Sequence, residues 1–134
     1  MHAPNRPPVL TILTNPVLDP RLGVERAYGD PVTWRDALEL LYELLPEYAA
    51  NLGAAMTAGD ATRMHRVAHS LSGASSYCGT VAVHVAAQQL EILCLQENAD
   101  ALPGAVNAVL HNIDRLIHLR QSGKLPPPDG APIY

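Results

Sequence analysis

The chain has 134 residues, of which 48% are hydrophobic and 16% charged, and its formal net charge at pH 7 is -4. This length supports one domain with a buried core and is too short for two. The charge balance provides no basic surface for nucleic acid and no polybasic anchor for direct membrane contact. Cys78 and Cys94 form neither a disulfide framework nor a CxxC zinc pair, which favours a reduced, cytoplasmic setting.

Proline-rich segments bound the expected domain. Residues 1–17 hold four prolines, and residues 124–134 hold four more. We therefore expect a flexible N-terminal segment over 1–17, a folded domain over 18–122 and a proline-rich tail over 123–134. Prolines interrupt the short apolar run near the N-terminus, so it is neither a convincing signal peptide nor a membrane span.

Helix start and stop signals recur along this domain. Asp19 and Asp30 are each followed by proline, which places an aspartate N-cap before a proline at the first helical position. Gly59 ends one helix and Asp60 caps the next. Pro46 should bend the helix that contains it without breaking it. These signals predict a short leading helix and four longer ones, over 20–28, 31–57, 61–77, 80–96 and 103–121.

Apolar residues recur every three or four positions in the longer segments, which is the period of an amphipathic helix. In the second segment they are Leu38, Leu41, Leu45, Tyr48, Leu52 and Met56. Val81, Val83 and Val85 alternate like a strand, but a lone strand would have no partner, so we favour a helix there. Four such helices with short connections predict an all-α fold, an antiparallel four-helix bundle with a short leading helix.

His69 lies in the stretch VAHSLSGASSYCG at 67–79. On a helical wheel its side chain points about 160° away from the buried stripe that contains Met64 and Leu71, so it should face solvent. Gly73 shares this open face one turn later, although glycine is less favourable in a helix than alanine by up to about 1 kcal/mol. The glycine therefore indicates clearance for a large partner that approaches the imidazole.

The other neighbours of His69 on this face are small or basic. Ser70, Ser72 and Ser76 keep the surface around the ring low. Arg66 adds a positive charge that can attract an anion such as a phosphoryl group. An ordinary imidazole also keeps a substantial neutral fraction at about pH 7, which suits a reversible nucleophile.

Two other kinds of chemistry compete for the same region. His65 and His69 stand four residues apart, a spacing used by two-histidine metal sites, but the glutamate of the HExxH motif is missing. We therefore expect no metal site. Cys78 falls near the buried direction and Cys94 has no evident base beside it, which disfavours a catalytic thiol.

The chain resembles the histidine phosphotransfer (HPt) domain family in a set of spaced residues: His69, Leu71, Gly73, Gly79 and the Leu90-Glu91 pair. The resemblance covers nearly all of 18–122, and the stretches SSYCG and VLDPRLGVERAYGDP are most like the C-terminal HPt domain of BarA/GacS-type hybrid sensor kinases. It implies a phosphorelay intermediate without kinase activity of its own. His69 would accept a phosphoryl group from a receiver-domain aspartate and pass it to an aspartate of a response regulator.

The resemblance also implies how the phosphoryl group would be supported. The partner receiver would supply Mg²⁺, so no cofactor is expected in this chain. Many members of the family have lysine directly before the glycine, at the position of Ser72, whose hydroxyl carries no charge. Arg66 or His65 is therefore expected to compensate in the vicinity of the phosphate. Gly73 would keep that vicinity open.

Further roles follow from the same resemblance. Gln88 is a candidate to orient the ring of His69, and Glu91 is expected to be structural. His65 and Ser76 are expected at the contact with the receiver. The domain would stand alone or form the C-terminal part of a membrane-bound hybrid kinase. The alternative, which the missing lysine suggests, is a helical bundle that binds receivers without being phosphorylated.

Overall fold

The computed structural model describes residues 15–134. Its helices are α2 (Pro20–Arg26), α3 (Pro31–Ala58), α4 (Ala61–Ser76), α5 (Val81–Leu95) and α6 (Leu102–Gln121), with a short 3-10 turn, η1 (Ala99–Ala101), before α6. All five predicted helices are present, and their ends differ from the prediction by one or two residues. The described part is all-α apart from one isolated β-bridge, which confirms the predicted fold class.

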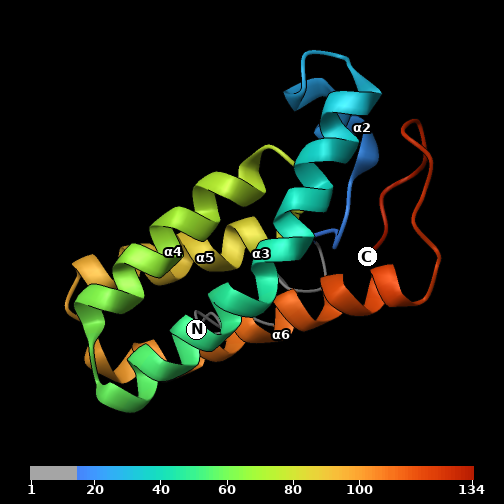
Figure 1. The fold of residues 1–134 in the computed structure, drawn as a ribbon. Coiled ribbons are helices and arrows are strands. Elements are labelled where there is room, and N and C mark those ends of the chain that lie inside the picture. The colour runs from blue at the N-terminus through green and yellow to red at the C-terminus, as the bar shows by residue number, and fades with distance from the viewer. Residues whose placement is uncertain (1–14) are drawn as a thin grey trace, which may run out of the picture.

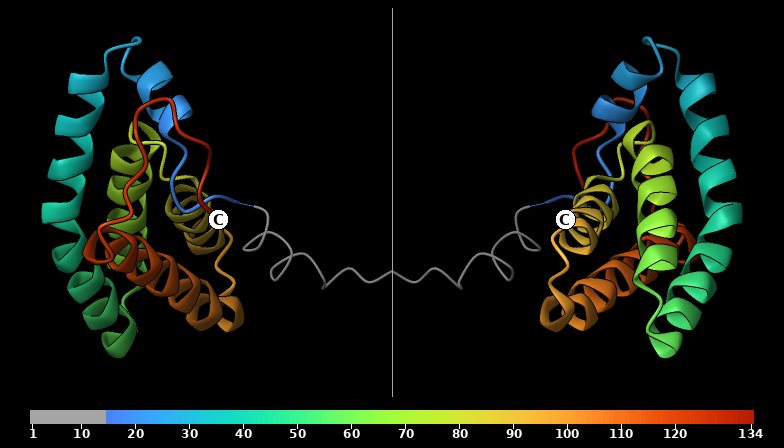
Figure 2. Two further views of the ribbon diagram at one scale, coloured as in Figure 1. Left: turned by 90° about the vertical axis from the view of Figure 1, so that its right-hand side faces the viewer. Right: turned by 90° about the vertical axis from the view of Figure 1, so that its left-hand side faces the viewer.

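Helices α3, α4, α5 and α6 form the bundle (Figure 1). Each packs against the next along the chain, and α6 returns to pack against α3, which closes the ring of four. The short α2 packs against α3 and extends one end of the bundle (Figure 2). Among residues 15–134, no helix has the length and apolar character needed to span a membrane.

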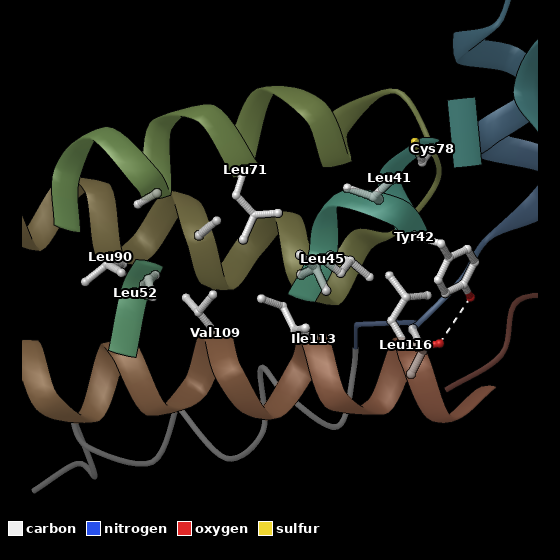
Figure 3. Packing of buried hydrophobic residues seen from close by; sticks show 14 of the residues in the cluster. Leu41, Tyr42, Leu45, Leu52, Leu71, Cys78, Leu90, Val109, Ile113 and Leu116 are labelled. Carbon is white, nitrogen blue, oxygen red and sulfur yellow. Dashed lines mark hydrogen bonds between the residues drawn. The ribbon is translucent and has the colours of Figure 1, made fainter. Parts of the chain in front are cut away.

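The centre of the bundle is filled by aliphatic side chains from all four long helices (Figure 3). Those with no exposed surface include Leu45, Leu52, Leu71, Leu90, Val109 and Leu116. Each buried leucine stabilises the fold by about 1.5–3 kcal/mol relative to an exposed one. Tyr42 places its ring in the same core, and its hydroxyl donates to the Leu116 carbonyl at 3.1 Å, joining α3 to α6.

The predicted caps are formed. Asp19, Asp30 and Asp60 each accept a hydrogen bond from a backbone N–H in the first turn of α2, α3 and α4. Gly59 ends α3 in the left-handed conformation, at φ 64°. Helix α3 continues through Pro46 without a break, as predicted.

Gly79 lets α2 pack closely against the turn between α4 and α5. Its φ is +74°, and a Cβ atom at this position would lie 2.2 Å from the Asp19 carbonyl oxygen. Asp19 N–H donates to the Gly79 carbonyl at 2.8 Å, and the Trp34 indole N–H donates to the Cys78 carbonyl, also at 2.8 Å. The second glycine of the motif is therefore architectural, because no larger residue fits this contact.

Replacing Gly79 with alanine should destabilise the bundle by about 2–4 kcal/mol, because left-handed strain adds to a clash with backbone. Urea denaturation followed by circular dichroism measures the change. Gly53→Ala is the matched control, since a Cβ atom there meets nothing within 4 Å inside α3. That variant should be as stable as the parent chain or more stable. Equal stability of Gly79→Ala and the parent chain would contradict the packing described here.

The proline-rich C-terminal segment, predicted as a tail, folds back onto the domain. Ile133 N–H donates to the Leu18 carbonyl at 2.8 Å, and Val17 N–H donates to the Ile133 carbonyl at 2.6 Å. Arg21 Nε also donates to the Asp129 carbonyl at 3.0 Å. Figure 2 shows this segment beside the chain that leads into α2. Proline favours extended backbone, so a proline-rich segment can reach such a partner without forming a helix.

The last residues of the predicted N-terminal segment also contact the bundle. Pro16 and Val17 are buried, and the Pro16 carbonyl accepts a hydrogen bond from Ala82 N–H at 2.9 Å. This bond ties the start of the described chain to the first turn of α5. The predicted flexible segment over 1–17 otherwise lies outside the described residues.

Candidate functional site

His69 lies in the middle of α4 on the outer face of the bundle. Its side chain is 74% exposed, whereas Met64, Ala68 and Leu71 of the same helix are buried. The orientation that the helical wheel predicts is therefore present. Gly73 is also exposed, and a Cβ atom there would meet nothing within 4 Å. The space one turn beyond the imidazole is open.

A carboxylate from α5 holds one nitrogen of this imidazole. His69 Nδ1 lies 2.6 Å from Glu91 Oε2. Because an ionised carboxylate only accepts hydrogen bonds, Nδ1 carries the proton and donates it. In the neutral ring Nε2 then has no proton and keeps its lone pair. The site thus presents an exposed imidazole in a defined tautomer.

Glu91 takes the position expected of Gln88. Gln88 is exposed on α5, and no hydrogen bond joins it to His69 in the part of the chain that the structure describes. Gln88 and Glu91 are three positions apart, so they lie on neighbouring parts of the surface of α5. The packing of α5 against α4 brings the carboxylate, and not the amide, to the ring.

His65 lies one turn before His69 and contacts both members of this pair. The two imidazole rings stack with centroids 6.2 Å apart and planes 11° apart. His65 Nε2 lies 3.9 Å from the same Glu91 oxygen that accepts from His69. His65 therefore belongs to the site itself and not only to its rim.

Ser72 is buried, which differs from its expected place among the small residues of the open face around His69. The residue is 8% exposed and lies between α4 and α5. His84 Nδ1 donates to the Ser72 carbonyl at 2.9 Å and lies 3.5 Å from the Ser72 hydroxyl. Helix α4 packs against both α3 and α5, so its buried arc is wider than its apolar stripe and includes this serine.

The two other residues predicted near His69 lie at the surface of α4. Arg66 is exposed and forms no ion pair among residues 15–134. Ser76 is half-buried, and its hydroxyl donates to the Gly73 carbonyl at 2.7 Å. Beside Arg66 is an open hollow of about 480 Å³, lined also by Ala61, Thr62, His65, Cys94, Leu95, Glu97, Ala99 and Leu102. Arg66 is thus a free positive charge next to the His65 end of the site.

Neither cysteine is suited to nucleophilic chemistry. Burial raises the pKa of the Cys78 thiol to about 11. Burial and the nearby Glu91 carboxylate also raise the pKa of Cys94. A thiol with a raised pKa stays protonated near neutral pH, and the thiolate is the reactive form. Within residues 15–134, no group of three or more histidine, cysteine or acidic side chains could hold a metal ion.

Comparison with known families agrees with this geometry. The family model of the Hpt domain matches residues 36–119, which include α4, α5 and nearly all of α3 and α6. The chain belongs to the Hpt domain family. Hpt domains act in histidine phosphotransfer within phosphorelays, generally through receiver domains. His69 and its exposed imidazole lie within the matched residues.

Two further comparisons show proteins to which this Hpt domain is similar. The chain is 34% identical over 100 residues to the sensor histidine kinase GacS of Pseudomonas protegens, covering 75% of this chain and 11% of the kinase. It therefore spans about a tenth of that protein's length. The HPT domain of a hybrid histidine kinase from Shewanella matches in structure with a TM-score of 0.72 at 21% identity, over 80% of this chain and 92% of that one. The latter match shows a shared fold.

Proposed function

We propose that this Hpt domain is a phosphorelay intermediate in which His69 accepts a phosphoryl group at Nε2 from one receiver aspartate and passes it to another. The observation that carries the proposal is the hydrogen bond from His69 Nδ1 to Glu91, on a ring that is 74% exposed. It leaves the outer nitrogen free to act as a nucleophile. A receiver can reach that nitrogen because the Gly73 position is open.

The proposed transfer needs no general base, because no proton has to be removed. The Nε2 lone pair attacks phosphorus of the aspartyl phosphate, and the bond from phosphorus to the aspartate oxygen breaks. The electron pair leaves on the carboxylate of the receiver, and the Nδ1 proton stays in its hydrogen bond. The same steps in reverse order transfer the phosphoryl group from His69 to the aspartate of a second receiver. In-line placement and electrostatic support supply the catalysis in such a reaction.

Glu91 is the proposed electrostatic support on the histidine side. When Nε2 bonds to phosphorus while Nδ1 keeps its proton, the ring gains positive charge. A carboxylate oxygen 2.6 Å from Nδ1 stabilises that charge, because hydrogen bonds between ionised groups are about twice as strong as neutral ones. The same contact keeps Nδ1 directed at Glu91 before the receiver arrives.

The phosphoryl group itself is proposed to meet positive charge from two sources. Arg66 is exposed on the same helix and carries no ion pair in the described chain, so its guanidinium is available to an anion. The receiver would bring Mg²⁺ with its own aspartate. Ser72 is buried and takes no part in binding the phosphoryl group. Arg66 therefore supplies the positive charge that a lysine at the Ser72 position would provide.

The face of α4 around His69 is the proposed docking surface for receivers. Ser76 lies on this face, and the side chain of Tyr77 directly after α4 is 61% exposed. An exposed aromatic side chain beside small residues suits a protein contact, since such side chains are enriched at interfaces. His65 borders the same surface from the other end.

Incubation with phosphorylated receiver domains tests the proposal. A receiver that has been phosphorylated by a small phosphodonor in the presence of Mg²⁺ is mixed with this Hpt domain. The products are separated by gel electrophoresis. We expect a phosphorylated Hpt band that is labile to acid and stable to base, as phosphohistidine is. A receiver whose acceptor aspartate is replaced by asparagine is the control. If no phosphorylated receiver labels the Hpt domain, the result would favour the alternative, a helical bundle that binds receivers without being phosphorylated.

Replacing Glu91 with glutamine should slow phosphoryl transfer by about fivefold, because a hydrogen bond to a charged acceptor is stronger by about 1 kcal/mol than one to a neutral acceptor. The amide oxygen can still accept from Nδ1, so the loss isolates the charge. Rapid-quench kinetics at saturating receiver measure it. Glu47→Gln, at an exposed position on α3, is the matched control. A rate for Glu91→Gln equal to that of the control would exclude electrostatic support by Glu91.

A further inference from the structure

The ring of His69 has few contacts that could restrain it. Its side chain is 74% exposed, so the core does not determine its rotamer. In the described part of the chain, the ring donates a hydrogen bond to Glu91 and stacks on His65. A single hydrogen bond leaves the ring free to rock about its Cα–Cβ and Cβ–Cγ bonds within the broad range of hydrogen-bond angles. The second contact is therefore what fixes the plane of the imidazole.

His65 provides this second contact from a better supported position. It is only 31% exposed, and its Nε2 atom is buried with no hydrogen-bond partner among residues 15–134. That atom faces Glu91 Oε2 at 3.9 Å, while the imidazole ring lies nearly parallel to the ring of His69. A small rotation brings Nε2 within hydrogen-bond range of the carboxylate, which satisfies a buried polar atom.

We propose that His65 is a positioning residue for the phosphoryl acceptor: it stacks on the ring of His69 and shares the Glu91 carboxylate with it. The stack restrains the plane of the acceptor ring, and the shared oxygen keeps Glu91 between the two histidines. Together they aim His69 Nε2 outward. This inference rests on the proposed function, because the benefit of a fixed ring lies in the in-line attack that the transfer requires.

The arrangement also explains why a half-buried histidine occupies this position. A partly buried aliphatic residue at 65 could pack against α5 but could neither stack as an aromatic ring nor donate to Glu91. A lysine or arginine could bind Glu91 fully and compete with His69 for its oxygen. Histidine combines a flat face with a donor that stands 3.9 Å from the carboxylate, beyond the 2.6 Å bond to His69.

Three variants at position 65 separate the two contacts. His65→Ala removes both, His65→Phe keeps an aromatic ring without a nitrogen, and His65→Gln keeps a polar end without a ring. At saturating receiver we expect His65→Ala to transfer about tenfold more slowly than the parent chain, with the other two variants between them. Affinity for the receiver should stay within about twofold, since the acceptor is misplaced and not removed. His111→Ala, at an exposed position on α6, is the control.

Nitrogen NMR of the histidine rings measures the tautomer of His69. This quantity would not change in the His65 variants if His65 only stabilised the fold. In the parent chain the His69 signals should report one tautomer, with the proton on Nδ1. In His65→Ala the unrestrained ring should leave its hydrogen bond to Glu91 for part of the time, so these signals should shift toward the average of the two tautomers. Thermal melting should stay close to that of the parent chain. This measurement needs no phosphoryl transfer. It therefore still decides the role of His65 if no receiver phosphorylates the parent chain, a result that would defeat the proposed function alone.

Either of two results would overturn the positioning role. The first is an unchanged saturated transfer rate and unchanged His69 spectra in all three variants. The second is weaker receiver binding in His65→Ala with an unchanged saturated rate and unchanged spectra, which would make His65 a docking residue only.

Discussion

Replacing His69 with glutamine should lower phosphoryl transfer to this Hpt domain by more than about a thousandfold, because the variant lacks the only nucleophilic atom that the proposed reaction uses. The bundle should keep its stability. The side chain is 74% exposed and contributes nothing to the core, so its loss leaves the packing of α4 unchanged. Labelling from a charged receiver, followed by gel separation, measures the transfer.

Two other histidines provide the comparison for this variant. His111 and His118 are exposed on α6, a helix that lies apart from the Gly73 face, and their replacement by glutamine should leave labelling unchanged. Circular dichroism of each variant establishes that the helices are intact. Labelling that persists in His69→Gln, or that disappears in His111→Gln, would show that the acceptor is another residue.

Replacing Gly73 with glutamine should slow transfer by about a hundredfold while leaving the domain at least as stable as before. A side chain at this position projects into the open space one turn beyond His69, where a Cβ atom meets nothing within 4 Å. A misplacement of the reacting atoms by about 1 Å is enough for a loss of this size. Glutamine is also a better helix former than glycine, by up to about 1 kcal/mol, so stability should not fall.

A matched glycine isolates this steric effect. Gly104 is exposed near the start of α6, and a Cβ atom there also meets nothing within 4 Å. Gly104→Gln should therefore leave transfer unchanged. Gly73→Ala adds only one methyl group and should fall between the parent chain and Gly73→Gln. Transfer by Gly73→Gln at the parent rate would mean that clearance at this position has no part in docking.

The helices and the orientation of His69 follow from local patterns in the sequence. An aspartate before proline specifies the start of α2 and α3, since the carboxylate caps free N–H groups and proline fits the first turn. The 3.6-residue period of apolar side chains places the core stripe of α4, and His69 falls opposite to it. These features depend on neighbours within one or two turns, so no tertiary information is needed to predict them.

The partner of His69 depends on how two helices cross, which the sequence does not reveal. Gln88 and Glu91 are both polar residues of α5, and how α5 packs against α4 decides which of them reaches the ring. Glu91 was detectable only through its membership of the Leu-Glu pair. Ser72 shows the same limit, because its small polar side chain gives no apolar signal for its burial between α4 and α5.

No local sequence pattern predicts that the C-terminal segment packs against the start of the described chain. Prolines at 126–128 and 132 are typical of tails and linkers, and they predict extended backbone without a destination. The β-bridge joins Leu18 to Ile133, which lie at opposite ends of the described chain. Such a pairing is set by where the two ends of the bundle bring the backbone, so only the assembled fold reveals it.

The central claim is that the phosphoryl group resides on Nε2 of His69 while Nδ1 remains bound to Glu91. Phosphorus NMR of the Hpt domain, labelled with ¹⁵N in its six histidines and phosphorylated by a receiver, tests this claim directly. We expect one phosphorus signal, coupled through one bond to Nε2 of His69. Coupling to Nδ1, or to a nitrogen of any other histidine, would contradict the geometry proposed for the transfer.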